Sequence, residues 1–163
     1  MKPGLKKVAT LCVLKSEGRL LLLKRKNPPN QGMFTPVGGK LEAHEAPLQA
    51  ALRETFEETG IRVTHMQFGG ILTETSPTKY NWINYVYQAE IPFQPAPPCN
   101  EGELCWIEPD QLDQIPTPPT DLAIYRFLGQ DQPFVIDAMY DQTLVLQVMR
   151  GEISGMDLLS SAI

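Results

Sequence analysis

The segment 39–61 constrains this chain more than any other part of its sequence. At fixed spacing it contains two glycines, one arginine and four glutamates, namely Gly39, Glu45, Arg53, Glu54, Glu57, Glu58 and Gly60. Apolar or small side chains recur at helical spacing over residues 46–60, which predicts a helix with one inward face. Pro47 suits the first turn of this helix and Gly60 suits the position just past its end. The segment therefore predicts a loop that leads into one acidic helix.

Three carboxylates of this helix are predicted to project together. Glu54, Glu57 and Glu58 stand at positions i, i+3 and i+4, so they share one face and repel one another by a few tenths of a kcal/mol per pair. A bound cation reverses that cost, and Mg²⁺ takes carboxylate and carbonyl oxygens while bridging to substrate phosphates. A solvated acidic face is the commoner role of a Glu-rich helix. The combined spacing of the glycines, the arginine and the glutamates favours a metal and diphosphate site instead.

With these residues the chain resembles the Nudix hydrolase family. The family signature is Gly-x5-Glu-x7-Arg-Glu-U-x-Glu-Glu-x-Gly-U, where U is a bulky aliphatic residue, and only Thr55 departs from it. Threonine is β-branched, so Thr55 is expected to pack inward as an aliphatic residue would. The resemblance implies an α/β fold, an α/β/α sandwich with a mixed β-sheet. It also implies hydrolysis of a nucleoside diphosphate linked to another group X, with Mg²⁺ as the cofactor and Mn²⁺ as the alternative. The resemblance leaves X open.

The resemblance also assigns a metal site. Glu57 and Glu58 are expected to be the main metal ligands, and Glu54 joins them. Gly38, just before the signature, is expected to offer its backbone carbonyl, because a residue without a side chain permits close approach.

Arg53 is expected to pair with Glu45 and so to tie the loop to the helix. A planar guanidinium does this better than lysine. We expect this pair to act mainly as a structural salt bridge that orients the catalytic carboxylates.

A second acidic region follows at residues 101–112. It resembles the segment that brings a late glutamate to the metal centre in many Nudix hydrolases. Glu101 is preferred for this role, as an extra ligand or as the base that activates water, and Glu103 is the alternative. Two exposed loop carboxylates with no role are the other interpretation.

The remaining resemblance is to pyrophosphohydrolases of the oxidised-purine (8-oxo-dGTP) type. It implies that Asp121 recognises the base edge, that Phe34 and Trp82 stack on the base, and that Arg25 points to the phosphates. Lys40 is also expected to bind the substrate. Asp121 could equally be a favourable charge at a helix N-terminus beside a capping Thr120. Phe34 and Trp82 could equally be core residues.

Other functions stay open. Pro77 lies sixteen residues past Ile61, an offset associated in this family with ADP-ribose pyrophosphatases. The triplet 76–78 also suits an ordinary turn between strands. ADP-ribose is therefore the second substrate hypothesis, followed by a non-catalytic nucleotide-binding regulator and by isomerisation of an isoprenoid diphosphate.

Composition agrees with these interpretations. The 163 residues are 42% hydrophobic, which predicts a single domain over 1–163. The net charge of −5 argues against a nucleic-acid polymer or a membrane surface as a partner. The expected partner is a nucleotide substrate, as the resemblance implies, and the protein is expected to be a monomer or a homodimer. Cys12, Cys99 and Cys105 lack CxxC spacing, which favours reduced thiols in a cytoplasmic protein.

Hydrophobic periodicity and turn signals predict the remaining elements. Strands are expected at 7–15, 19–26, 80–91, 104–107, 134–140 and 143–149, with a short extended piece at 34–37. Residues 62–75 are expected to form one long strand or two, broken near Gly69-Gly70. A second helix is expected at 119–128, and residues 93–98 are expected to cross the surface.

Overall fold

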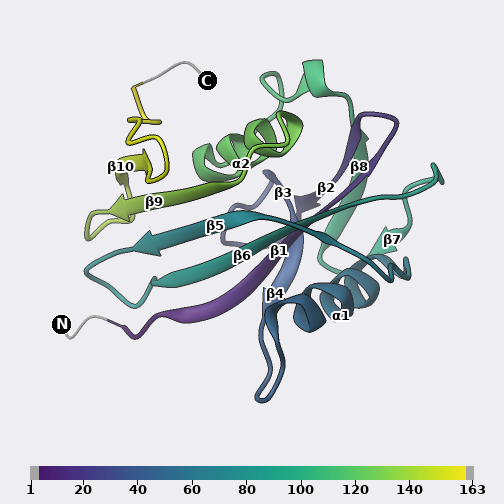
Figure 1. The fold of residues 1–163 in the computed structure, drawn as a ribbon, viewed down its shortest axis with the longest axis horizontal. Helices are drawn as coiled ribbons and strands as arrows, with labels where there is room; N and C mark the ends of the chain where they lie inside the picture. Colours follow the sequence, from purple (N-terminus) through teal and green to yellow (C-terminus); the bar gives the residue numbers. More distant parts are fainter. Residues whose placement is uncertain (1–3, 161–163) are drawn as a thin grey trace.

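The computed structural model describes residues 4–160, which form an α/β/α sandwich. Helix α1 (Pro47–Thr59) covers one face of a large mixed β-sheet and helix α2 (Pro119–Gly129) covers the other (Figure 1). The fold class expected from the sequence is confirmed.

Ten strands are present among the described residues. They are β1 (Lys7–Ser16), β2 (Arg19–Arg25), β3 (Phe34–Thr35), β4 (Val37–Lys40), β5 (Gln67–Thr75), β6 (Trp82–Glu90), β7 (Pro98–Cys99), β8 (Gly102–Ile107), β9 (Phe134–Tyr140) and β10 (Leu146–Gly151). A short 3₁₀ turn, η1 (Pro109–Gln111), precedes α2.

The strand order places β1 and β6 at the centre of the sheet. The order is β10-β9-β5-β6-β1-β2-β8-β7, with β3 paired to β2 and β4 paired to β1. The β1–β6 and β5–β9 pairs are parallel, and the other pairs are antiparallel. Because β4 leads into α1, its pairing with β1 fixes the start of the signature segment against the middle of the sheet.

Alternation along the strands divides the core into two layers. On β1, Val13 packs into the cluster beneath α2, whereas Cys12 and Leu14 pack into the cluster beneath α1. On β2, Leu22 and Leu21 divide in the same way. Successive strand side chains point to opposite faces, so a strand buried on both sides is a continuous apolar run.

Helix α1 has the ends expected from the sequence and part of the expected inward face, but Leu48, which was expected on that face, is 41% exposed and Leu52 is only half-buried. Its buried residues are Ala50, Ala51, Thr55 and Thr59, so Thr55 packs inward as predicted. Pro47 is the first helical residue, and Gly60 adopts the left-handed conformation, with φ 71°, that ends the helix.

The strand predicted over 62–75 differs in its start. Only Gln67–Thr75 is extended, and its pairing with β6 shifts register between Phe68 and Gly70, near the predicted break. A bulge of this kind keeps the strand continuous while it bends.

The closing hairpin has a longer turn than the two residues expected. Strand β10 begins at Leu146 rather than at residue 143. The Asp141 Oδ1 atom accepts hydrogen bonds from the backbone N–H groups of Thr143 and Val145, at 2.8 and 3.0 Å. These bonds hold residues 141–145 in a turn, because an aspartate side chain can replace a backbone partner.

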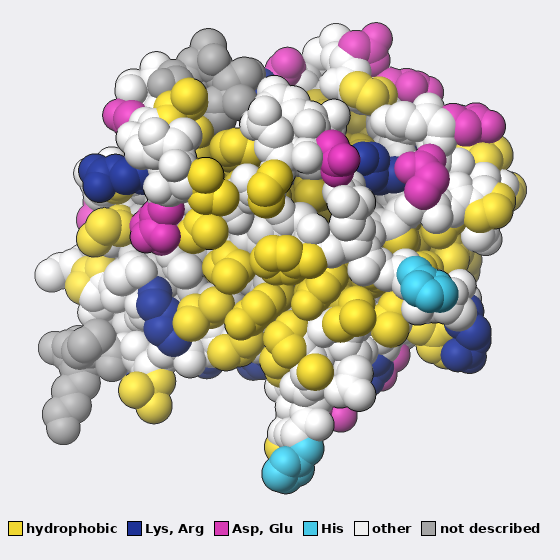
Figure 2. All heavy atoms as spheres, viewed as in Figure 1, with side chains coloured by type: hydrophobic (Ala, Val, Ile, Leu, Met, Phe, Trp, Pro, Cys, Tyr) yellow, Lys and Arg dark blue, Asp and Glu magenta, His cyan; other side chains and the backbone are white. Residues whose placement is uncertain are grey.

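Hydrophobic side chains are not confined to the core. On the face shown in Figure 2 they gather across the middle of the molecule. Phe68, Met139 and Leu144 are among the large apolar residues that are exposed. Within residues 4–160 no helix combines the length and the apolar character needed to cross a membrane.

Candidate active site

A cavity of about 1040 Å³ opens beside Gly38 and Gly39, which lie within strand β4 and do not form the turn expected from the sequence. Its walls come from both ends of the chain, including β1, β2, β4, α1, β5, β6, α2 and β9. This volume lies at the upper end of the range for small-molecule sites. The cavity can therefore hold a ligand of nucleotide size.

The structure brings most of the predicted site residues to this cavity. Its lining includes Arg25, Gly38, Lys40, Arg53, Glu54, Glu58, Trp82, Glu101 and Asp121. Three predicted residues lie outside the lining, namely Phe34, Glu45 and Glu57.

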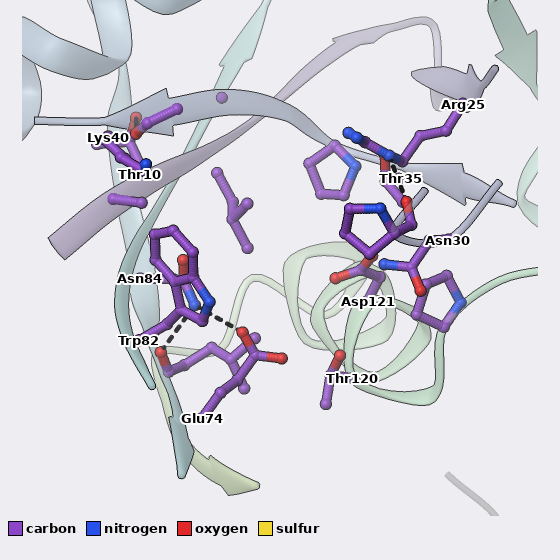
Figure 3. A pocket seen from close by; sticks show the side chains of 18 of the residues that line it. Thr10, Arg25, Asn30, Thr35, Lys40, Glu74, Trp82, Asn84, Thr120 and Asp121 are labelled. Atoms are coloured by element: carbon purple, nitrogen blue, oxygen red, sulfur yellow. Dashed lines mark hydrogen bonds between the residues drawn. The ribbon is translucent and has the colours of Figure 1, made fainter. Parts of the chain in front are cut away.

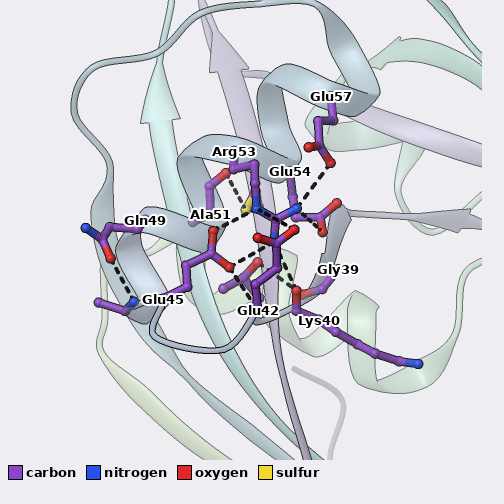
Figure 4. Close-up of polar contacts among 12 residues, drawn as sticks. Gly39, Lys40, Glu42, Glu45, Gln49, Ala51, Arg53, Glu54 and Glu57 are labelled. Atoms are coloured by element: carbon purple, nitrogen blue, oxygen red, sulfur yellow. Dashed lines mark hydrogen bonds and ion pairs between the residues drawn. The ribbon is translucent and has the colours of Figure 1, made fainter.

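Arg53 holds the signature loop and the helix together (Figure 4). Its guanidinium donates to both carboxylate oxygens of Glu45, at 2.7 and 2.9 Å, and to the backbone carbonyl of Lys40 at 3.1 Å. It also donates to Glu54 at 2.8 Å and to Glu57 at 3.1 Å. The fixed fork of the guanidinium makes this many contacts possible, which a lysine ammonium cannot match.

The two glycines before the helix allow close packing at the site. Gly38 has φ 151°, and a Cβ atom there would overlap the carbonyl oxygen of Thr10 on β1. A Cβ atom at Gly39 would overlap the carboxylate of Glu54. Side chains at these two positions would therefore displace β4 or the acidic face of α1.

Glu58 is the most perturbed carboxylate of the helix. Its Oε2 atom accepts a hydrogen bond from the Gly38 N–H at 3.2 Å. The pKa of Glu58 is raised to about 7, mainly by burial and also by the charges of Glu54 and Glu101, against the lowering effects of the Gly38 N–H and Arg25. Its neighbours therefore do not supply enough positive charge to keep Glu58 fully ionised near neutral pH.

The two late glutamates are separated by the structure. Glu101 lines the cavity, whereas Glu103 lies exposed on β8, opposite Lys24 in the β2–β8 register. Glu101 is therefore the one of the two that lies with the signature carboxylates.

The other end of the cavity carries two buried polar groups without partners (Figure 3). Asp121, at the start of α2, is only 7% exposed, and its carboxylate makes no hydrogen bond or ion pair with any residue of 4–160. Burial raises its pKa well above the usual value, and the charge of Glu74 adds to this. The Thr35 hydroxyl is also buried in the lining without a partner.

The expected cap of α2 is not formed. Pro118, rather than Thr120, occupies the position before the helix, and Thr120 lies within the first turn. The burial of Asp121 also distinguishes it from an ordinary solvated charge at a helix end.

The two predicted stacking residues have different surroundings. Phe34 is 8% exposed and belongs to the core beneath α2, where its carbonyl accepts a hydrogen bond from the Tyr125 hydroxyl at 3.2 Å. The indole of Trp82 lines the cavity, with the Nζ atoms of Lys7 and Lys40 at 5.4 and 5.9 Å from its ring centroid. Of the two, only Trp82 presents a face to a ligand in the cavity.

The NUDIX domain family model matches residues 5–128, which include the whole signature segment. The chain belongs to the Nudix family. As a MutT-like Nudix hydrolase it acts on pyrophosphate bonds.

Curated relatives and solved structures agree with this membership. An uncharacterized Nudix hydrolase, YvcI of Bacillus subtilis, is 29% identical over 128 residues, which are 76% of this chain and 79% of the relative. Phosphatase NudJ of Escherichia coli is 27% identical over 112 residues, 66% of this chain and 71% of the relative.

Among solved structures, the mutator MutT protein from Bacillus halodurans has a TM-score of 0.79 at 25% identity, covering 90% of this chain and 98% of that one. The Nudix domain of Shewanella oneidensis NrtR, complexed with ADP ribose, has a TM-score of 0.67 at 18% identity, covering 77% and 88% of the two chains. The second likeness concerns the fold alone.

Nudix hydrolases use divalent metals, and the acidic groups of this chain fit one. Among residues 4–160 no three acidic, histidine or cysteine side chains meet as a complete metal cage. Glu54 and Glu57 instead contact Arg53. However, the donors are of the oxygen type that hard cations prefer, and Mg²⁺ usually takes one or two carboxylates together with substrate phosphates. The pKa of Glu58 is raised first by burial, and the nearby charges of Glu54 and Glu101 add to this, which a bound cation would offset.

Sequence reasoning missed part of this Nudix site. Glu74, Tyr80, Asn84 and Tyr140 line the cavity, and none of them was singled out. The strand pattern contained a signal for Glu74, because it lies two residues from the buried Leu72 and so shares its face.

The Pro77 segment forms an ordinary turn between β5 and β6. The Ser76 hydroxyl donates to the Tyr80 carbonyl at 2.7 Å, and the Thr78 N–H donates back to the Ser76 hydroxyl at 3.1 Å. Pro77 is exposed and lies outside the cavity lining.

Proposed function

We propose that this Nudix hydrolase is a Mg²⁺-dependent pyrophosphohydrolase of purine nucleoside triphosphates. It releases the nucleoside monophosphate and pyrophosphate, and it prefers oxidised guanine nucleotides such as 8-oxo-dGTP. The observation that carries this proposal is Asp121, a buried carboxylate without a partner in the same cavity as the signature carboxylates. Such a group is stable in a low-dielectric site only when a donor reaches it.

The signature end of the cavity is proposed to hold the phosphates. Glu54, Glu57, Glu58 and Glu101 would hold Mg²⁺ together with the carbonyl of Gly38. The bound metal supplies Lewis-acid stabilisation of the phosphoryl oxygens and lowers the pKa of water.

Arg25 and Lys40 extend the positive charge of this end. Both line the cavity, and the Arg25 Nε–H is already fixed by the Pro29 carbonyl at 2.7 Å. This contact leaves the terminal guanidinium nitrogens free to meet phosphate oxygens, which a guanidinium binds in a bidentate manner.

The reaction needs a proton acceptor and fixed geometry. Water attacks one phosphorus while the bond from that phosphorus to the bridging oxygen breaks, and the proton of the water passes to a cavity carboxylate. Glu58 and Glu101 both line the cavity and are the candidates for this proton acceptor. Arg53 fixes the position of the helix relative to the loop by its contacts to Glu45 and to the Lys40 carbonyl.

The base end is proposed to hold a purine. Asp121 would accept hydrogen bonds from ring and exocyclic N–H groups, and the indole of Trp82 would stack near the base. Phe34 is not part of this proposal, because it lies in the core. The spacing of Pro77 suggested ADP-ribose as a substrate. However, Pro77 lies outside the cavity lining, so its position does not favour that substrate.

The test is a panel of 8-oxo-dGTP, dGTP, dCTP, ADP-ribose and a dinucleoside polyphosphate, with Mg²⁺ and with a chelator. The expected result is metal-dependent release of pyrophosphate with the highest kcat/KM for 8-oxo-dGTP. A kcat/KM at least about tenfold higher for ADP-ribose, about 1.4 kcal/mol, would overturn the substrate assignment. Tight binding of one nucleotide without turnover of any would favour a regulator.

A further inference from the structure

Glu74 is a buried carboxylate on β5 that the catalytic step does not use. Its Oε1 atom accepts hydrogen bonds from the hydroxyls of Tyr80 and Tyr140, at 3.1 and 2.9 Å. Its Oε2 atom accepts one from the Asn84 amide at 3.2 Å. All three donors are neutral, and Lys6 reaches only the backbone carbonyl of Glu74, at 2.7 Å.

This environment favours an uncharged group over a carboxylate. Within residues 4–160 the Glu74 carboxylate forms no ion pair. A buried charge held only by neutral donors costs more than a glutamine amide of similar shape would. Burial accordingly raises the pKa of Glu74. The Glu74 carboxylate therefore needs a further donor, and a ligand in the cavity could supply it.

The cavity side of Glu74 is open to such a donor. Glu74 and Asn84 stand on one side of the cavity, and Asp121, Thr35 and Arg25 stand on the other (Figure 3). The Oε2 atom accepts one hydrogen bond from the protein, so acceptor capacity remains on it.

A second, independent observation points to a ligand between these walls. Asp121 is 7% exposed, its carboxylate has no partner among the described residues, and the buried Thr35 hydroxyl in the same cavity lining is also unpaired. The charge of Glu74 also acts on Asp121 across the cavity. A ligand with N–H groups on one edge would satisfy both carboxylates and relieve their repulsion.

We propose that Glu74 is a specificity-determining residue that works with Asp121 to select bases with an imino N–H and an exocyclic amino group on one edge. This inference rests on the proposed function, since it requires a base at this end of the cavity. A guanine-type base offers both groups, hypoxanthine offers only the imino N–H, and adenine has an acceptor at the same ring position. A buried acceptor that a base leaves unpaired penalises that base strongly.

The experiment compares dGTP with dITP, which differ by the amino group alone. In Glu74→Gln the ratio of kcat/KM for dGTP to that for dITP is expected to fall about tenfold or more, mainly through dGTP. The matched control is Glu90→Gln, the same change at an exposed position on β6 outside the cavity, which should leave the ratio unchanged.

A structural role for Glu74 gives a different result. If the carboxylate only supports Tyr80 and Tyr140, the variant should slow both substrates equally, and an unchanged ratio would overturn the inference. If Glu74→Gln fails to fold, Glu74→Asp keeps the charge but withdraws the acceptor by one methylene, and it should lower the ratio as well.

A binding measurement separates this inference from the proposed function. The Kd values of dGMP and dIMP, measured by calorimetry, need no turnover. If the wild-type protein cleaves neither triphosphate, the proposed function fails, but a preference for dGMP that shrinks in Glu74→Gln still supports the inference. Equal affinities of the wild-type protein for the two monophosphates would overturn it.

Discussion

Arg53 and Glu45 form a two-pronged ion pair, with Nε–Oε1 and Nη2–Oε2 distances of 2.7 and 2.9 Å. Its hydrogen bonds to Arg53 lower the pKa of Glu45 to about 2, so the pair stays charged throughout the working pH range. The same guanidinium contacts Glu54, Glu57 and the Lys40 carbonyl. The pair therefore sets the position of the helix carboxylates relative to the loop.

We expect Arg53→Lys to lower kcat/KM by about tenfold or more, because an ammonium cannot make the bidentate bond and hold the other partners at once. The control is Arg62→Lys, since the Arg62 guanidinium lies over the Phe56 ring at 4.5 Å, just past the same helix. Steady-state kinetics with a thermal melt of each variant would check this. Equal activities of the two variants would contradict the role given to Arg53.

The raised pKa of Glu58 predicts a pH-dependent stability of the metal-free protein. The pKa is about 7 in the folded state against an ordinary value of 4.5, so the folded state prefers the neutral form. The contribution of Glu58 to the free energy of unfolding is then fully present below about pH 4.5 and is lost as the pH rises through about 7. In the presence of a chelator, the Tm of Glu58→Gln should be higher than that of the wild-type protein by about 2 °C or more at pH 8, and by less at pH 5.

The wild-type protein and Glu58→Gln also test whether Glu58 takes part in Mg²⁺ binding. At pH 8, Mg²⁺ should raise the Tm of the wild-type protein more than that of Glu58→Gln, because binding to the folded state stabilises it. Glu103→Gln serves as the control and should behave as the wild-type protein does. A Tm difference that does not depend on pH would count against the proposed environment of Glu58.

Glu101 and Glu103 offer a matched pair of substitutions two residues apart. Glu101 lines the cavity and Glu103 lies exposed outside it. We expect Glu101→Gln to lower kcat by about a hundredfold, the lower end of the effect of a general base, and Glu103→Gln to remain near the wild-type rate. A larger loss in Glu103→Gln would reverse the assignment.

The two tryptophans allow ligand binding to be followed by fluorescence. Trp82 lines the cavity, whereas the indole N–H of Trp106 donates to the Gln94 carbonyl at 2.7 Å away from it. A nucleotide should change the emission of Trp106→Phe, which retains Trp82. The nucleotide should have little effect on the emission of Trp82→Phe, which retains only Trp106. The reverse pattern would place the ligand elsewhere.

Local sequence signals predicted the acidic helix well. The spacing of Ala51 and Thr55, the proline at its start and Gly60 at its end define the helix by residues within a few positions of one another. Its boundaries are confirmed, and so are Ala51, Thr55 and Thr59 on its inward face, whereas Leu48 is exposed. Predictions were weaker where a side chain replaced a backbone partner, as Asp141 does in the turn before β10.

The stacking and base-recognition residues depended on contacts between distant segments. Phe34 and Trp82 are similar in sequence terms, yet the neighbours that α2 supplies bury Phe34, while Trp82 remains at the cavity. Asp121 and Glu74 lie 47 positions apart along the chain. No periodicity within either segment indicates that they face the same cavity.

The sequence by itself determined the family, the acidic helix and the type of chemistry, because those depend on residues held together by one helix and one loop. Only the tertiary structure decided which aromatic ring and which late glutamate reach the cavity, and that Glu74 stands opposite Asp121. The physical reason is that these positions follow from strand pairing and from helix packing on the sheet, which join residues far apart in the chain.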